Sequence, residues 1–332
     1  MQELMKFNPI IVVSGEPYSI FLELFFKVYS SKLIKTYNRP LILVASKKLI
    51  LNQMKILGYK FNINLINQNM LNKKILNNQK INLIDVNFNY KNKNNKISFK
   101  SKKYINTCFD LALKLMKNKI GFALINGPIS KKHFLNKKFL GITEYLAHKT
   151  NTKNNEVMLI YNDKISVSPI TTHLPLKEVN KKIKTGMIVK KIKIINSFYK
   201  KYLNKKIKFA VCGLNPHCET INKFSEEDKI IKPAIKILKR NKINVEGPLS
   251  ADTLFMKKNI KKYDVFIGMY HDQVLAPIKA LFGFDSINIT LGLPFIRISP
   301  DHGPNNSMFG KNKSNPKSLI ESLSFLKKIR AN

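Results

Sequence analysis

VFIGMYHDQVLAPIKAL, residues 265–281, gives the clearest indication of the fold of this chain. Its first part, 265–269, is a short apolar run of the kind that forms a buried strand. The apolar positions over 272–281 recur at helical spacing, so the stretch predicts a strand, a polar turn and a helix in immediate succession. A strand that leads directly into a helix is the building unit of a parallel sheet covered by helices.

The same alternation extends over all 332 residues. Other strand-like runs are found at 10–14, 41–45, 121–125, 157–161, 165–170 and 207–212. Helical patterns are found at 47–57, 101–117, 176–203, 226–239 and 316–328, and paired strands turning near Gly292 are expected over 287–298. We therefore expect an α/β fold with a parallel or mixed sheet, and the length suggests about two domains.

The chain is strongly basic, with 59 lysines and arginines against 20 aspartates and glutamates and a formal net charge of +39. Only four of the basic residues are arginines, and the lysines are spread through almost every segment among many asparagines. A protein that reads bases or grips phosphates usually favours arginine, whose fork binds two acceptors at once. The pattern favours compositional drift over a specific nucleic-acid partner, although weak binding to polyanions at low salt is expected.

Other features of the sequence limit its location and partners. No apolar run reaches the roughly 18–20 residues that a membrane-spanning helix needs, and the N-terminus lacks the pattern of a signal peptide. The three cysteines are too few for a disulfide scaffold and suit a reducing compartment. We therefore expect a cytoplasmic protein that has no membrane partner.

Three histidines each follow a strand-like run, namely His173, His217 and His271. Ligands of open α/β sheets bind beyond the carboxyl ends of the strands, so three imidazoles placed there could hold one divalent metal ion. The spacing alone leaves two alternatives open. The histidines could belong to unrelated loops, or His217 could join Cys212 and Cys218 in a structural zinc site.

The sequence says less about cofactor and substrate. No glycine-rich fingerprint of the GxGxxG type is present, so the residues that bind a nucleotide cofactor are not identified. Lys279 follows the strand of His271, and Arg297 lies among apolar residues. A pocket with a metal ion, a lysine and an arginine would suit a substrate with phosphate or carboxylate groups. A single lysine in such a chain is more often a solvated side chain, and Arg297 could equally be structural.

Eight segments, taken in order, carry a family resemblance. They are NGPISK (126–131), GITEYLA (141–147), TTHLPL (171–176), VCGLNPH (211–217), GPLSADT (247–253), MYHDQ (269–273), NITLGLP (288–294) and DHG (301–303). Together they closely resemble the 4-hydroxythreonine-4-phosphate dehydrogenase family of pyridoxal phosphate biosynthesis. The resemblance is dense over about 120–305 and weak over 1–119.

The resemblance implies a two-domain α/β/α sandwich like that of the isocitrate and isopropylmalate dehydrogenases, with the active site in the interdomain cleft. On this basis we expect one domain of residues 1–126 plus 303–332, and a second of 127–302 that carries the metal and dimer contacts. The family also implies a homodimer whose subunits share the active site, so that one metal ligand comes from the partner subunit.

The resemblance carries roles over to particular residues. It implies that His173, His217 and His271 bind one divalent metal ion, which could be zinc, cobalt or magnesium. It implies substrate contacts for a second set of residues, Thr143, Lys279, Asn288 and Arg297, while either Lys279 or Asp272 could move protons. The implied reaction is oxidation of 4-phosphohydroxy-L-threonine by NAD, followed by decarboxylation to 3-amino-2-oxopropyl phosphate.

The chain departs from the family pattern at three places. Ile142 stands where the family usually has a substrate-contacting histidine. The glycine-rich motif near the N-terminus is reduced to GEPYSI (15–20), and the one after the NPH segment is replaced by CETINK (218–223). These departures leave two alternatives open: a paralogue that acts on a threonate- or erythronate-4-phosphate type of hydroxy acid, and a homologue with weakened catalysis.

Overall fold

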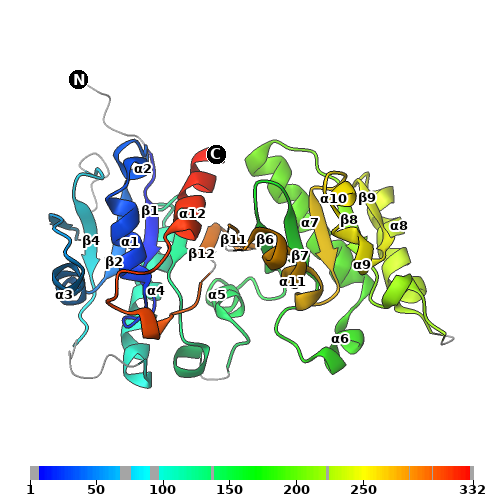
Figure 1. Cartoon of the computed structure of the whole chain (residues 1–332), viewed down its shortest axis with the longest axis horizontal. Helices are drawn as coiled ribbons and strands as arrows, with labels where there is room; N and C mark the ends of the chain where they lie inside the picture. Colours follow the sequence, from blue (N-terminus) through cyan, green and yellow to red (C-terminus); the bar gives the residue numbers. More distant parts are fainter. Residues whose placement is uncertain are drawn as a thin grey trace. The chain divides into compact units, whose positions relative to one another are not determined.

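The computed structural model of the chain describes residues 7–67, 76–89, 97–135, 138–221, 224–283, 285–300 and 302–329. The chain forms two compact units, one of residues 1–145 and 295–328 and the other of residues 146–294 and 329–332. Each unit combines strands of a sheet with helices packed on it, so the expected α/β class is confirmed (Figure 1). The expected domain limits stay a prediction, because a compact unit is not by itself an independently folding domain.

The described strands of the first unit form a parallel sheet. They are β1 (Ile10–Val13), β2 (Leu41–Ala45), β3 (Ile63–Leu65), β4 (Ile81–Asp85), β5 (Ala123–Asn126) and β12 (Ile296–Pro300). Their order is β3-β4-β2-β1-β5-β12. Every residue of β1 and β2 is buried. Because successive side chains of a strand point to opposite faces, both faces of the sheet must be covered here.

The described helices of the first unit are α1 (Phe21–Tyr29), α2 (Lys32–Lys35), α3 (Lys47–Leu57), α4 (Lys102–Lys117) and α12 (Lys317–Lys328), with short turns η2 (Phe99–Ser101), η3 (Lys131–Leu135) and η7 (Asn306–Met308). Helix α4 packs against β1, β2 and β5, while α12 packs against β12 and α1. Ser46 caps the start of α3, and Gly58 ends it with a left-handed φ of 75°, so the expected helix 47–57 is confirmed. Helix α5 (Ile142–Lys149) begins in this unit and ends in the other.

The sheet of the second unit is mixed. Its described strands are β6 (Val157–Tyr161), β7 (Ser166–Pro169), β8 (Phe209–Cys212), β9 (Val245–Leu249), β10 (Val265–Gly268) and β11 (Ile287–Leu291), in the order β11-β6-β7-β10-β8-β9. Strand β6 is antiparallel to both of its neighbours, and the strands from β7 to β9 are parallel. The two parallel pairings of β10 bring β7, β10 and β8 side by side.

The described helices and turns of the second unit are α6 (Leu176–Lys182), α7 (Thr185–Phe198), η4 (Tyr199–Leu203), η5 (Pro216–Cys218), η6 (Glu227–Ile231), α8 (Lys232–Arg240), α9 (Ala251–Leu254), α10 (Lys257–Ile260) and α11 (His271–Phe282). Helix α7 packs against β6 and β11, α11 against β7 and β10, and α8 against α7 and β9. In the part of the chain that the structure describes, no helix has both the length and the apolar character needed to cross a membrane.

The structure refines two expectations for this unit. The helical segment expected over 176–203 is interrupted, because Ile183 is extended and turns its side chain into the core. The helix expected over 226–239 begins as the wide turn η6, and Ser225 caps it by accepting from the backbone N–H of Asp228 at 3.3 Å. Among the described strands, β9 is an edge strand and contains Pro248. Proline has no backbone N–H, and an edge strand tolerates this because one of its sides pairs with no other strand.

Candidate active site

The three histidines follow three neighbouring parallel strands of the second unit. His173 follows β7, His271 follows β10 and His217 follows β8. The carboxyl ends of parallel strands meet at one edge of a sheet, and this edge is where open α/β sheets bind ligands. The positions of the three histidines in the sequence and the strand order β7-β10-β8 therefore indicate the same edge of the sheet.

Two of these histidines form a close pair. The ring centres of His173 and His271 lie 5.7 Å apart with the rings tilted by 37°. An imidazole nitrogen binds zinc at about 2.1 Å, so two rings on one ion have centres about 5–6 Å apart. Asp272 Oδ1 lies 2.6 Å from His271 Nδ1, which leaves Nε2 as the nitrogen available to an ion. The pair fits two of the ligands of a divalent metal ion.

His217 has a different environment. Its side chain is 75% exposed, and its Nδ1 lies 3.9 Å from Asp252 Oδ2. Within the described part of one chain, no three His, Cys, Asp or Glu side chains come together in a way that could hold a metal ion. One described chain thus brings His173 and His271 together without a third ligand, and it likewise assembles no site from His217, Cys212 and Cys218.

Hydrogen bonds tie the three histidine loops to one another. Thr171 Oγ1, two residues before His173, donates to the backbone oxygen of Met269 at 2.8 Å. Gln273 accepts from the backbone N–H of Met269 and donates to the backbone oxygen of Gly213, both at 2.7 Å. Sequence reasoning did not single out Gln273 for this role, because its partners are backbone groups that no side-chain pattern reveals. The only signal was its place directly after His271 and Asp272.

The other expected site residues of the second unit lie on α11 and β11. Lys279 is two helical turns after His271 and half-buried, and burial lowers its pKa. Asp272 is exposed and engaged with His271. Asn288 lies opposite Ile160 in β6, and its Oδ1 is buried without a hydrogen-bond partner among the residues described. Such an atom suits a donor that a bound molecule would bring.

Arg297 and Thr143 belong to the first unit. Arg297 is fully buried on β12, and its Nε donates to Asn126 Oδ1 at 2.7 Å. Burial lowers the pKa of Arg297, while the nearby charge of Glu144 raises it. Thr143 is half-buried in the first turn of α5, directly after Ile142. The guanidinium is therefore held in place by an amide rather than free in solvent.

A buried acid lies in the loop that follows β1. Strand β1 has β2 on one side and β5 on the other, so the strand order changes direction there, and loops at such a point often bind ligands. Glu16 is 2% exposed in the loop after β1, and Ser101 Oγ donates to its Oε1 at 2.9 Å. Burial raises the pKa of Glu16 to about 7, although the bond from Ser101 lowers it. The reduced GEPYSI motif thus keeps a carboxyl group that titrates near neutral pH.

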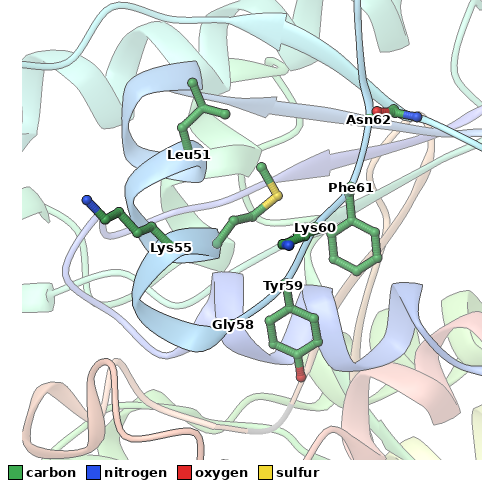
Figure 2. Close-up of a pocket in the computed structure, with 8 residues that line it drawn as sticks. Leu51, Lys55, Gly58, Tyr59, Lys60, Phe61 and Asn62 are labelled. Atoms are coloured by element: carbon green, nitrogen blue, oxygen red, sulfur yellow. The ribbon is translucent and has the colours of Figure 1, made fainter.

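A separate hollow of about 540 Å³ lies at the end of α3 and the approach to β3 (Figure 2). Its lining residues are Leu51, Met54, Lys55, Gly58, Tyr59, Lys60, Phe61 and Asn62. The rings of Tyr59 and Phe61 stack with centres 5.7 Å apart. None of the expected site residues lines it, and its lining offers lysines but no histidine or carboxylate for metal or acid–base chemistry.

Solved structures show the class to which this fold belongs. Isocitrate dehydrogenase from Methylococcus capsulatus shares the fold, with a TM-score of 0.50 and 8% identity over 97% of this chain and 85% of that chain. The crystal structure of 4-hydroxythreonine-4-phosphate dehydrogenase from Klebsiella pneumoniae gives a TM-score of 0.82 and 26% identity, covering 98% of both chains. The class is an α/β dehydrogenase, as the motifs indicated.

Sequence comparison then gives the family. The profile of the family described as pyridoxal phosphate biosynthetic protein PdxA matches residues 36–326. The 4-hydroxythreonine-4-phosphate dehydrogenase of Sulfurihydrogenibium sp. (strain YO3AOP1) is 36% identical over 326 residues, which are 96% of this chain and 98% of that protein. The chain belongs to the PdxA family, and the resemblance drawn from its motifs is confirmed.

Proposed function

We propose that this chain is an NAD-dependent and divalent-metal-dependent dehydrogenase that acts on 4-phosphohydroxy-L-threonine. With NAD bound as the hydride acceptor, the secondary alcohol would be oxidised, and the resulting β-keto acid would lose CO2 to give 3-amino-2-oxopropyl phosphate for pyridoxal 5'-phosphate (vitamin B6) biosynthesis. The observation that carries the proposal is the 36% identity to a relative of that name over 96% of this chain. The pair formed by His173 and His271 supplies a candidate centre for this chemistry.

The metal site of the proposal begins with that pair. His173 and His271 would hold one zinc, cobalt or magnesium ion, and His217 of a second copy of the chain would complete the set in a homodimer. The exposure of the His217 side chain supports this division, because an exposed imidazole is accessible to another chain. When bound, the ion would act as a Lewis acid on the substrate oxygen. Asp272 fixes the ring and tautomer of His271 for this purpose.

Proton movement in the proposal is assigned to Lys279 rather than Asp272. The carboxylate of Asp272 is already bonded to His271, whereas burial lowers the pKa of Lys279. A lowered pKa makes the neutral amine more available near neutral pH, so Nζ can take the alcohol proton and return one after CO2 leaves.

Substrate contacts in the proposal come from Thr143, Asn288, Arg297 and Lys279. The buried cation of Arg297 attracts the phosphate and carboxylate groups, and burial strengthens such attraction because little water screens it. Lys279 would contact the substrate hydroxyl whose proton it takes. The buried Oδ1 of Asn288 would accept from a substrate N–H or O–H.

A second candidate substrate class is favoured by one residue, Ile142. An apolar side chain in place of a substrate-contacting histidine would suit a hydroxy acid phosphate of the threonate or erythronate type. The test is NADH formation by the purified chain with each substrate, with and without added divalent ions. NADH from 4-phosphohydroxy-L-threonine only when the ion is present supports the first assignment. NADH from the sugar-acid phosphate alone overturns it, and no turnover of either indicates weakened catalysis.

The proposal also includes a cytoplasmic homodimer without a specific nucleic-acid partner. The lysine-rich composition supports non-specific attraction to polyanions, which weakens steeply with salt. Sedimentation gives the oligomeric state, and binding to RNA across salt concentrations tests the partner. Sequence-selective binding that persists at about 200 mM salt would contradict this part of the proposal.

A further inference from the structure

His217 lies in a short loop after β8, residues 213–218, which we call the His217 loop. Two of its residues, His217 and Cys218, have φ values of 56° and 62°. This left-handed region is rarely adopted by residues other than glycine, and it persists only where surrounding contacts hold the backbone. The structure must therefore contain groups that fix this loop while the His217 side chain stays exposed.

The group that fixes the loop is the carboxylate of Glu227, which is fully buried at the start of η6. Its Oε1 accepts from the backbone N–H of Leu214 at 2.7 Å and of Asn215 at 2.9 Å. Its Oε2 accepts from the Asn215 side-chain amide at 2.9 Å and from the Ser225 hydroxyl at 3.1 Å. Three of these four bonds come from the His217 loop itself.

The charge of Glu227 strengthens this arrangement. A buried carboxylate is unfavourable unless its oxygens are hydrogen-bonded, and bonds to an ionised acceptor are stronger than bonds between neutral groups. Burial raises the pKa of Glu227, but the bonds from Asn215 and Leu214 outweigh this effect and leave the pKa below its usual value. The carboxylate is thus ionised at neutral pH and holds the loop firmly.

The loop is also packed tightly against this carboxylate and anchored at its first residue. A Cβ atom on Gly213 would lie 2.7 Å from Cys218 Sγ and 3.1 Å from Glu227 Oε1, so a larger residue there would displace the Cys218 thiol and press on the Glu227 carboxylate. The side-chain amide of Gln273 holds the backbone oxygen of Gly213. The backbone of the loop is therefore bonded by Gln273 at Gly213 and by Glu227 at residues 214–215.

We propose that Glu227 is a positioning residue, which holds the His217 loop in the conformation that presents the His217 imidazole to a divalent metal ion. This inference rests on the proposed function, in which His217 is a metal ligand. Glu227 touches neither ion nor substrate in this role and acts through the backbone of residues 214–215.

The test compares two full-length variants, Glu227→Gln and Glu23→Gln. The amide of Glu227→Gln keeps the size of the side chain but offers one acceptor oxygen, so it cannot accept all four bonds. Glu23 is a matched control, since it is a buried carboxylate of the first unit that accepts from Ser314 N and Lys27 Nζ. Three quantities are measured: amide hydrogen exchange of residues 213–218 without metal, zinc affinity by chelator competition, and the visible spectrum of bound cobalt.

We expect Glu227→Gln to accelerate exchange in the His217 loop, weaken zinc binding by about tenfold or more, and change the cobalt spectrum. Glu23→Gln should lower the unfolding temperature but leave all three quantities as in the wild type. Unchanged exchange or unchanged zinc affinity in Glu227→Gln overturns the proposal. An equal loss of zinc affinity in Glu23→Gln overturns it as well, because the effect would then be general destabilisation.

The same experiment separates this inference from the proposed function. A wild-type chain that binds no zinc, or a His217→Ala variant that binds zinc as tightly as the wild type, refutes the assignment of His217 as a ligand. The exchange measurement on Glu227→Gln still decides whether this carboxylate holds the loop.

Discussion

The side-chain amide of Gln273 donates to the backbone oxygen of Gly213 at 2.7 Å across 60 residues of sequence. Its own oxygen accepts from the backbone N–H of Met269, two residues before His271. Because Gly213 begins the His217 loop, one glutamine joins the loops that carry His217 and His271. The spacing of these loops is therefore fixed within one chain, whichever subunit each imidazole serves.

Gln273→Glu tests this link with a side chain of nearly the same shape. A carboxylate still accepts from Met269 but cannot donate to Gly213, so it leaves the backbone oxygen of Gly213 facing a negative charge. We expect a loss of about 1–3 kcal/mol in the free energy of unfolding, together with weaker zinc binding. Denaturant unfolding and chelator competition measure the two effects. Wild-type values in both would show that the link is dispensable.

The sequence predicted the strands and helices well where local pattern and packing agree. The strand 41–45 and the helix 47–57 match β2 and α3 at both ends, because a continuous apolar run, an N-cap serine and a C-terminal glycine all coincide there. Strand β9 had no such support, since its Gly247 and Pro248 are residues that strands usually avoid. Its pairing with β8 comes from tertiary structure and is not visible in the local sequence.

The site was predictable in a similar, partial way. Histidines that follow strand-like runs must lie at the ligand-binding edge of an α/β sheet, so the setting of His173, His217 and His271 could be inferred. The groups that hold them could not, because Glu227 and Gln273 bond mainly to backbone atoms that are distant in sequence. Glu227 looked like an ordinary acid in the first turn of a helix, and only the fold shows that it is buried under the His217 loop.

Glu16 predicts a pH dependence of stability. Its pKa is about 7 in the folded chain against a usual value of 4.5, so the folded state binds a proton that the unfolded state has released between these pH values. Its contribution to stability is fully present below about pH 4.5 and is lost as pH rises through about 7. The total change corresponds to about 3 kcal/mol. Glu16→Gln, which stays neutral, should remove this slope.

The measurement is denaturant unfolding of wild type and Glu16→Gln at several pH values from about 5 to 8. All other titrating groups are common to both proteins, so they cancel in the difference. We expect the variant to gain stability relative to the wild type as pH rises. A difference that is constant over this range would mean that Glu16 is ionised in the folded chain at all of these pH values.

Arg297→Lys keeps the positive charge at this position but replaces the planar guanidinium, which has several donors, by a compact ammonium. The buried guanidinium donates from Nε to Asn126 and can also bind an anion through two parallel donors. A lysine ammonium cannot do both at once. We expect a higher KM for the phosphorylated substrate and a stability loss of about 1–3 kcal/mol. Arg240→Lys, at an exposed position of α8, is the control and should change neither the KM nor the free energy of unfolding. A KM equal to that of the wild type would remove Arg297 from the substrate contacts.

Gly15→Ala and Gly58→Ala form a matched pair, because both glycines have a left-handed φ, 73° and 75° respectively. The strain of placing alanine there, about 1–2 kcal/mol, is common to both variants. At Gly58 a Cβ atom meets nothing within 4 Å, whereas at Gly15 it would collide with the backbone oxygen of Pro128. This contact joins the loops that follow β1 and β5, where Glu16 N also donates to Pro128 O at 2.9 Å. Gly15→Ala should therefore lower the free energy of unfolding by about 1–3 kcal/mol more than Gly58→Ala, as measured by denaturant unfolding. Equal decreases in the two variants would show that the two loops can separate freely.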